Sequence, residues 1–166
     1  MHSKKPLPLR QFVSFTVGGA LYGFDIHIVK EITPMVAITA VPLMKTDISG
    51  VVNIRGQVVL VLNIAAILNE NVRTSNSDSQ IIILRTSREI TAGLDFKPNF
   101  DPQVMGDKPA GFLVDSVGEI IAVEASRVEG TPTHLGAIHT QYIEGVVHLD
   151  EPLIVLDVSK IIASSQ

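Results

Sequence analysis

Alternating apolar and polar residues near the start of the chain predict a β-hairpin. Between residues 12 and 17, apolar side chains alternate with serine and threonine, which is the period of a strand with one buried face. Gly18 and Gly19 follow, and glycine readily adopts the positive φ angles of a tight turn. We therefore expect a returning strand at residues 21–29.

The next stretch predicts shorter elements. Residues 29–34 end in Thr33-Pro34 and suggest a bend, because proline lacks the amide hydrogen of a continuing strand. Residues 38–41 predict a short extended piece, and Asp47 can cap a single turn near Ile48.

Two apolar runs predict a second hairpin and a short helix after it. Residues 50–54 and 57–62 are separated by an Arg-Gly turn, which would place Arg55 at the tip of the hairpin. Asn63 can then cap a helix over residues 64–68, because its side chain can accept a hydrogen bond from the first helical turn.

The second half of the chain repeats the pattern of the first. Beyond a candidate linker at residues 69–79, apolar runs predict strands at residues 80–84, 111–117, 120–123 and 145–158, with a closing helix from Ser159. Glycine and Glu-Ile recur at the same spacing in residues 23–32 and 111–120, and residues 50–54 resemble residues 145–149. This order indicates two copies of one small β unit. Strands this short usually protect their edges by closing into a barrel, so two small barrels side by side are expected.

Residues 86–109 break this pattern. Pro98, Pro102 and Pro109 occur there among scattered charges, with no steady hydrophobic period. We expect a long excursion that is either mobile or wrapped over the surface.

The composition narrows the possible partners. The net charge of −4 offers no basic field for phosphates, which argues against nucleic acid as a principal partner. The absence of cysteine excludes disulfides and thiolate chemistry, in agreement with a reducing cytoplasm. Residues 1–11 are expected to form a flexible tail. The apolar runs are shorter than the roughly 20 residues of a membrane-spanning helix, so direct membrane insertion is not expected.

Candidate catalytic or metal-binding groups do not form a known pattern. His134 and His139 are five residues apart, which does not place them on one helix face, and no metal or cofactor is expected. Asp25, Asp115 and Asp157 border apolar runs, where they are expected to face solvent or cap the next turn. The sequence has no P-loop, dinucleotide fingerprint or nucleophile elbow, so we do not expect an enzyme.

Arg55 remains as a candidate binding residue. On a rigid turn, its planar guanidinium can make bidentate contacts with the carboxylate or carbonyl groups of a partner. The alternative is an internal salt bridge, with Glu31 as a possible partner. The apolar residues beside it, Val29 and Ile32, belong either to the core or to the lining of a groove.

Several blocks of the sequence resemble the CheW-like domain family. The blocks are Gly19 to Phe24, Val29 to Ile32, Val41-Pro42, Gly50 to Val58, Gly111 to Val117, Gly145-Val146 and Ile154 to Asp157. The Asn-Ile-Arg-Gly block is the most specific of them, and the resemblance covers residues 12–162. It implies a single domain of two SH3-like, five-stranded β-barrel subdomains with short helices. The first would span residues 12–75 and the second residues 80–162, with strand exchange between the halves possible.

The resemblance also implies a function and a set of partners. Members of the family are non-catalytic adaptors that couple chemoreceptors to the CheA histidine kinase. One barrel face would meet the regulatory domain of the kinase, and the groove between the barrels would take the helical tip of the receptor. The protein would then be cytoplasmic and recruited to receptor arrays at the membrane. The residues expected to bind partners are Val29, Glu31, Ile32, Gly50, Asn53, Arg55, Gly56 and Val114.

Departures from the family pattern keep other functions open. Leu60 and Asn63 stand where the family usually has proline and then aspartate, and the excursion at residues 86–109 is longer than in a typical member. One alternative is a double barrel that binds a small ligand or acts as an enzyme. Another is a structural paralogue that binds other adaptors in rings without contacting a kinase.

Overall fold

The computed structural model describes residues 8–42, 47–68, 78–93, 101–130 and 140–164. It confirms a mainly β protein with two five-stranded sheets and a few short helices. The strands within the described residues are β1 (Leu9–Val17), β2 (Ala20–Asp25), β3 (Val29–Pro34), β4 (Ile48–Ile54), β5 (Gln57–Asn63), β6 (Gln80–Leu84), β7 (Ala110–Val114), β8 (Ser116–Glu124), β9 (Ile143–Val147) and β10 (Leu153–Leu156). The α-helices are α1 (Ile64–Ile67), α2 (Ser87–Ala92) and α3 (Val158–Ser164), and the 3-10 helices are η1 (Ile26–Ile28), η2 (Pro102–Met105), η3 (Ala125–Arg127) and η4 (Thr140–Tyr142).

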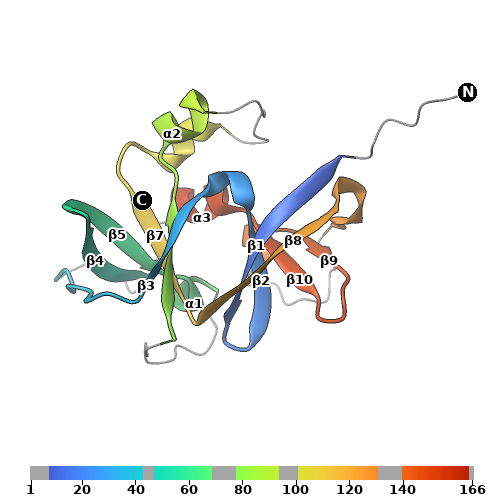
Figure 1. The fold of residues 1–166 in the computed structure, drawn as a ribbon, viewed down its shortest axis with the longest axis horizontal. Helices are drawn as coiled ribbons and strands as arrows, with labels where there is room; N and C mark the ends of the chain where they lie inside the picture. Colours follow the sequence, from blue (N-terminus) through green and yellow to red (C-terminus); the bar gives the residue numbers. More distant parts are fainter. Residues whose placement is uncertain (1–7, 43–46, 69–77, 94–100, 131–139, 165–166) are drawn as a thin grey trace, which may run out of the picture.

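The two sheets share one strand order. We call the sheet β8-β1-β2-β10-β9 the terminal barrel and the sheet β3-β6-β7-β5-β4 the central barrel; Figure 1 shows them side by side. When β1 to β5 are matched to β6 to β10, the two orders coincide, and the parallel pairs β2/β10 and β7/β5 also coincide. This symmetry agrees with the repeat in the sequence. However, each sheet takes strands from both of the segments 12–75 and 80–162, so neither segment builds a barrel by itself.

Each barrel is closed at the same place by one β-bridge. Thr39, after β3, bridges Val51 of β4, and Glu129, after β8, bridges Val146 of β9. The backbones approach so closely that a Cβ atom on Gly50 would lie 2.2 Å from the Thr39 carbonyl oxygen. A Cβ atom on Gly145 would lie 2.4 Å from the Glu129 carbonyl oxygen. Closure of both barrels therefore requires glycine at these equivalent positions.

The chain crosses between the barrels where unbroken strands were expected. The strand expected at residues 21–29 ends at Asp25, whose side chain caps η1, and β3 then starts in the other barrel. The strand expected at residues 111–117 likewise ends before Asp115, and β8 leaves for the terminal barrel. The bend expected at residues 29–34 is also wrong, because this segment pairs with β6 as a strand.

Other local predictions have mixed outcomes. The hairpins at Gly18-Gly19 and at Arg55 are confirmed. The predicted helix cap at Asn63 is also confirmed, because its side-chain oxygen accepts a hydrogen bond from the Ala66 amide at the start of α1. Asp47 does not cap a turn, because β4 begins at the next residue. Strand β1 starts at Leu9, so the flexible tail expected at residues 1–11 is too long; residues 1–7 lie outside the described residues.

A shared core joins the barrels. Buried side chains from β1, β2, β5, β6, β7, α1 and α3 form one cluster, while two smaller clusters fill the individual barrels. The Phe24 ring of the terminal barrel lies between Phe15 at 4.6 Å and Phe112 of the central barrel at 5.2 Å, measured between ring centroids. Such aromatic contacts stabilise the fold beyond the burial of apolar area alone. The two barrels are therefore packed as one unit.

The described part of the excursion is ordered and packed. Thr86 and Glu89 form a reciprocal capping box at the start of α2. Ile90 of α2 and Met105 of η2 are buried in the shared core. Residues 86–93 and 101–109 therefore pack against the barrels, although the sequence showed no period there; residues 94–100 lie outside the described residues.

Candidate partner-binding site at the Arg55 hairpin

The tip of the β4–β5 hairpin is a tight turn with Arg55 at its apex. Arg55 has φ 50° and Gly56 has φ 82°, so both residues adopt the left-handed conformation of a two-residue hairpin turn. The side-chain oxygen of Asn53 accepts a hydrogen bond from the Gly56 amide at 2.9 Å. Asn53 and Gly56 therefore hold the turn that presents Arg55.

The Arg55 side chain is both exposed and paired. It is 73% exposed, and its Nη2 donates to both carboxylate oxygens of Glu31 on β3, whose side chain is 27% exposed. The hydrogen bond from Arg55 lowers the pKa of Glu31, so the carboxylate stays charged at neutral pH. The ion pair suggested as an alternative in the sequence therefore exists, yet it leaves most of the guanidinium open to solvent.

The remaining predicted residues divide into buried and exposed positions. Val29 and Val114 are buried in the shared core, and Gly50 is buried against the Thr39 carbonyl. The side chains of Val29 and Val114 pack inside the chain and Gly50 has no side chain, so direct contact of these three residues with a partner stays a prediction. Ile32, in contrast, is 40% exposed on the same strand as Glu31.

Sequence reasoning missed two residues beside this pair. Lys30 Nζ lies 2.8 Å from Glu89 Oε2, and this contact joins β3 to α2. The Thr-x-x-Glu spacing of a capping box at residues 86–89 is a signal that could have located α2 and Glu89. It could not have indicated that α2 lies next to Lys30, because that depends on tertiary packing.

Two hollows flank the hairpin. A cavity of about 220 Å³ is lined by residues that include Lys30, Glu31 and Arg55. A larger groove of about 590 Å³ is mainly apolar and is lined by Val51, Val58, Leu60, Leu62, Met105, Gly106, Asp107, Lys108, Pro109, Ala110 and Ile162. Val58 at this groove is 62% exposed, which makes the hairpin a surface with both an apolar and a charged part.

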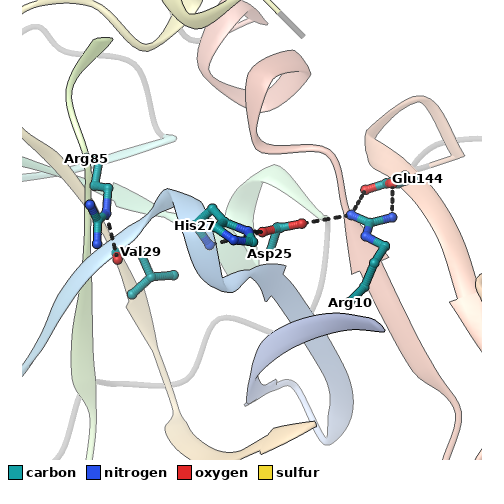
Figure 2. A network of polar contacts seen from close by, with 6 residues as sticks. All are labelled: Arg10, Asp25, His27, Val29, Arg85 and Glu144. Carbon is teal, nitrogen blue, oxygen red and sulfur yellow. Dashed lines mark hydrogen bonds and ion pairs between the residues drawn. The ribbon is translucent and has the colours of Figure 1, made fainter. Parts of the chain in front are cut away.

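A charged network holds the crossover that leads into β3 (Figure 2). Arg10 of β1 pairs with Glu144 of β9 and, at 3.0 Å, with Asp25 at the end of β2. Asp25 also accepts the His27 amide at 3.0 Å and lies 2.7 Å from the His27 Nδ1 atom. These contacts fix η1, and therefore the start of the strand that carries Glu31.

The network predicts a loss of stability in acid. Burial acts to raise the pKa of Asp25, but the hydrogen bonds from His27 and the contact with Arg10 outweigh it and hold this pKa below its ordinary value. Because the pKa of Asp25 is lower in the native state than in the unfolded chain, where it is about 3.9, the ionised carboxylate stabilises the fold at higher pH. This stabilisation is lost as the pH falls through the native pKa. We expect the free energy of unfolding to fall steeply below about pH 4 and less steeply in Asp25→Asn. Urea unfolding between pH 3 and 6, followed by far-UV circular dichroism, measures both slopes; parallel slopes would contradict the assignment to Asp25.

The other carboxylates have structural partners. Asp115 accepts the Gly18 amide at 2.9 Å, and Asp157 accepts the Lys160 amide at the start of α3. Among the residues that the structure describes, no three His, Cys, Asp or Glu side chains form a group that could hold a metal ion; His134 and His139 lie outside them. Within the same residues, no helix has the length and apolar character needed to cross a membrane.

Comparison with known proteins decides the family. The protein-family model described as the CheW-like domain matches residues 11–166. The chain belongs to the CheW-like family. It is 26% identical to the chemotaxis protein CheW of Treponema pallidum over 99% of this chain and 91% of that protein. It is 25% identical to the chemotaxis protein CheW of Klebsiella aerogenes, over 95% of this chain and 84% of that protein.

A solved structure shares the fold of this CheW-like chain. The crystal structure of the scaffolding protein TtCheW from Thermoanaerobacter tengcongensis matches with a TM-score of 0.72 and 27% identity, over 95% of this chain and 90% of that one. CheW-like proteins are non-catalytic scaffold or adaptor proteins of chemotaxis. The chain is therefore a chemotaxis scaffold rather than an enzyme, and the Arg55 hairpin is a candidate surface for its signalling partners.

Proposed function

We propose that the chain couples chemoreceptors to a CheA-type histidine kinase. The regulatory domain of the kinase and the helical tip of the receptor are its two partners, and receptor arrays recruit it from the cytoplasm to the membrane. Family membership supports this role. The observation that carries the site is the exposed Arg55 guanidinium on a rigid turn, held by Glu31.

The geometry explains how this site can recognise a protein. Nη2 of Arg55 donates its hydrogen bonds to Glu31, while the rest of the guanidinium is open to a carboxylate or a carbonyl group of a partner. The ion pair reduces the rotational freedom of Arg55 before binding, which lowers the entropic cost of the contact. Ile32 and Val58 offer apolar area nearby, so the hairpin combines a polar anchor with an apolar surface.

Arg55→Ala is expected to weaken binding of at least one of the two partners by about tenfold or more while leaving the fold intact. The fold should persist because the side chain is exposed and the turn is held by Asn53 and Gly56. A pull-down from the native cytoplasm with wild type and variant, followed by mass spectrometry, identifies the partners. Titration calorimetry with each recovered partner then gives the affinities.

Arg127→Ala is the matched control. It removes an exposed arginine from the terminal barrel, where Arg127 donates to the His148 carbonyl, and it should leave both affinities unchanged. Unchanged binding of both partners by Arg55→Ala would refute the site. Recovery of neither a kinase nor a receptor by wild type, with a metabolite bound instead, would refute the coupling function.

A further inference from the structure

Glu31 lies beside two cations, Arg55 and Lys30. Lys30 is the extra residue of a β-bulge, because Val29 pairs with Leu84 while Glu31 pairs with Ile83. A bulge re-aims the side chains next to it. Lys30 and Glu31 accordingly line the same cavity as Arg55, and the charge of Lys30 helps to lower the pKa of Glu31.

Helix α2 holds Lys30 through the side chain of Glu89. Oε2 of Glu89 lies 2.8 Å from Lys30 Nζ, while Oε1 of the same carboxylate accepts the Thr86 amide at 3.0 Å. The two oxygens thus have separate tasks: one pairs with Lys30 and the other caps the helix. Four charges alternate in the order Arg55, Glu31, Lys30, Glu89, and each carboxylate holds one cation.

The position of Glu89 is set by packing of the excursion. Ile90 of α2 is buried in the shared core, and the Ser87 amide donates to the Gly106 carbonyl at 2.9 Å. Met105, next to Gly106, is buried in the same core. Glu89 is therefore presented to β3 by a segment that is itself packed into the shared core.

We propose that Glu89 is a positioning residue for Arg55, because it keeps Lys30 from competing for Glu31. A lysine ammonium is a point charge on a flexible stem, so Lys30 released from Glu89 can turn to the Glu31 carboxylate beside it. Arg55 would then share its anchor and lose part of its fixed orientation. The effect on partner binding rests on the proposed function, whereas the exchange of ion pairs does not.

Glu89→Gln tests this in the free chain. Glutamine also fits a capping box, so α2 keeps its cap while the charge is lost. Nuclear magnetic resonance of the arginine side chains measures how fast the Arg55 guanidinium rotates. We expect faster rotation in Glu89→Gln and a return to the wild-type rate in Glu89→Gln/Lys30→Gln, where the competing cation is gone. Glu119→Gln, an exposed position on β8 that corresponds to Glu31 in the repeat, should leave the rate unchanged.

The double variant separates positioning from a simple tether. If the Lys30–Glu89 pair only fastened α2 to β3, removal of both charges would leave Arg55 as mobile as Glu89→Gln alone does. That result, or an unchanged rate in Glu89→Gln, would overturn the proposal.

Partner affinity is the second measurement. With the kinase recovered by the wild-type chain, we expect about two- to fivefold weaker binding for Glu89→Gln and a return to the wild-type affinity in the double variant. If the rotation of Arg55 responds as expected while Arg55→Ala binds every partner normally, positioning by Glu89 is supported and the proposed contact surface fails. The two failures are thus distinguishable.

Discussion

Gly50→Ala is expected to lower the free energy of unfolding by about 3 kcal/mol or more, since steric overlap and backbone strain add. The new Cβ atom would lie 2.2 Å from the Thr39 carbonyl oxygen and 2.8 Å from the Thr39 carbonyl carbon. Both are backbone atoms, and Thr39 cannot withdraw without breaking its two hydrogen bonds to Val51. Gly50 also has φ 144°, where side chains are strained.

The equivalent change in the terminal barrel should have a similar effect. A Cβ atom on Gly145 would meet the Glu129 carbonyl oxygen at 2.4 Å and Val128 Cγ1 at 2.8 Å. Gly130→Ala is the matched control, because a Cβ atom there meets no atom within 4 Å; we expect a change within about 0.5 kcal/mol. Urea unfolding followed by far-UV circular dichroism measures all three variants. Equal stability of Gly50→Ala and Gly130→Ala would refute closure by glycine.

Arg10→Ala is expected to cost about 2 kcal/mol of stability, between the values for exposed and for fully buried ion pairs. The Arg10 side chain is 22% exposed, so screening by solvent reduces the effect below that of a buried charge. Without Arg10, the carboxylates of Asp25 and Glu144 lose their shared cation. The contact of the guanidinium with the Phe12 ring, at 4.8 Å from the centroid, is lost as well.

A triple variant distinguishes lost pairing from lost packing. Arg10→Met/Asp25→Asn/Glu144→Gln removes the arginine together with both carboxylates, so no partly buried charge remains unpaired. Its unfolding free energy, measured in the same urea assay, should lie closer to wild type than that of Arg10→Met, which has the same side chain at residue 10 but leaves both carboxylates without their shared cation. Arg127→Ala on the exposed surface serves as the control for loss of an arginine. A triple variant less stable than Arg10→Met would contradict the electrostatic explanation.

The packed excursion forms part of the surface around the Arg55 hairpin. Residues Met105 to Ala110 line the apolar groove next to the hairpin, and Glu89 reaches the neighbouring strand through Lys30. Both features come from the segment at residues 86–109. The segment thus supplies part of the groove wall and the second carboxylate of this surface.

The candidate site was only partly predictable from the sequence. Arg55 could be predicted because an Arg-Gly turn between two apolar runs places it at a hairpin tip whatever the rest of the fold. The sequence could not place Val29 and Val114 in the core or in a groove, because an apolar residue in a strand looks the same in both; the structure buries both in the shared core. Glu89 was missed because its contact with Lys30 joins residues 59 positions apart.

The sequence by itself determined the local elements: both hairpin turns, the Asn63 cap, the buried strands and the repeat of a small β unit. These follow from hydrophobic period and turn chemistry, which act over a few residues. Only the tertiary structure decided which barrel each strand joins, that Gly50 and Gly145 close the barrels, and that Glu31 pairs with Arg55. Those outcomes depend on contacts between distant segments, whose free energy arises only when the whole core assembles.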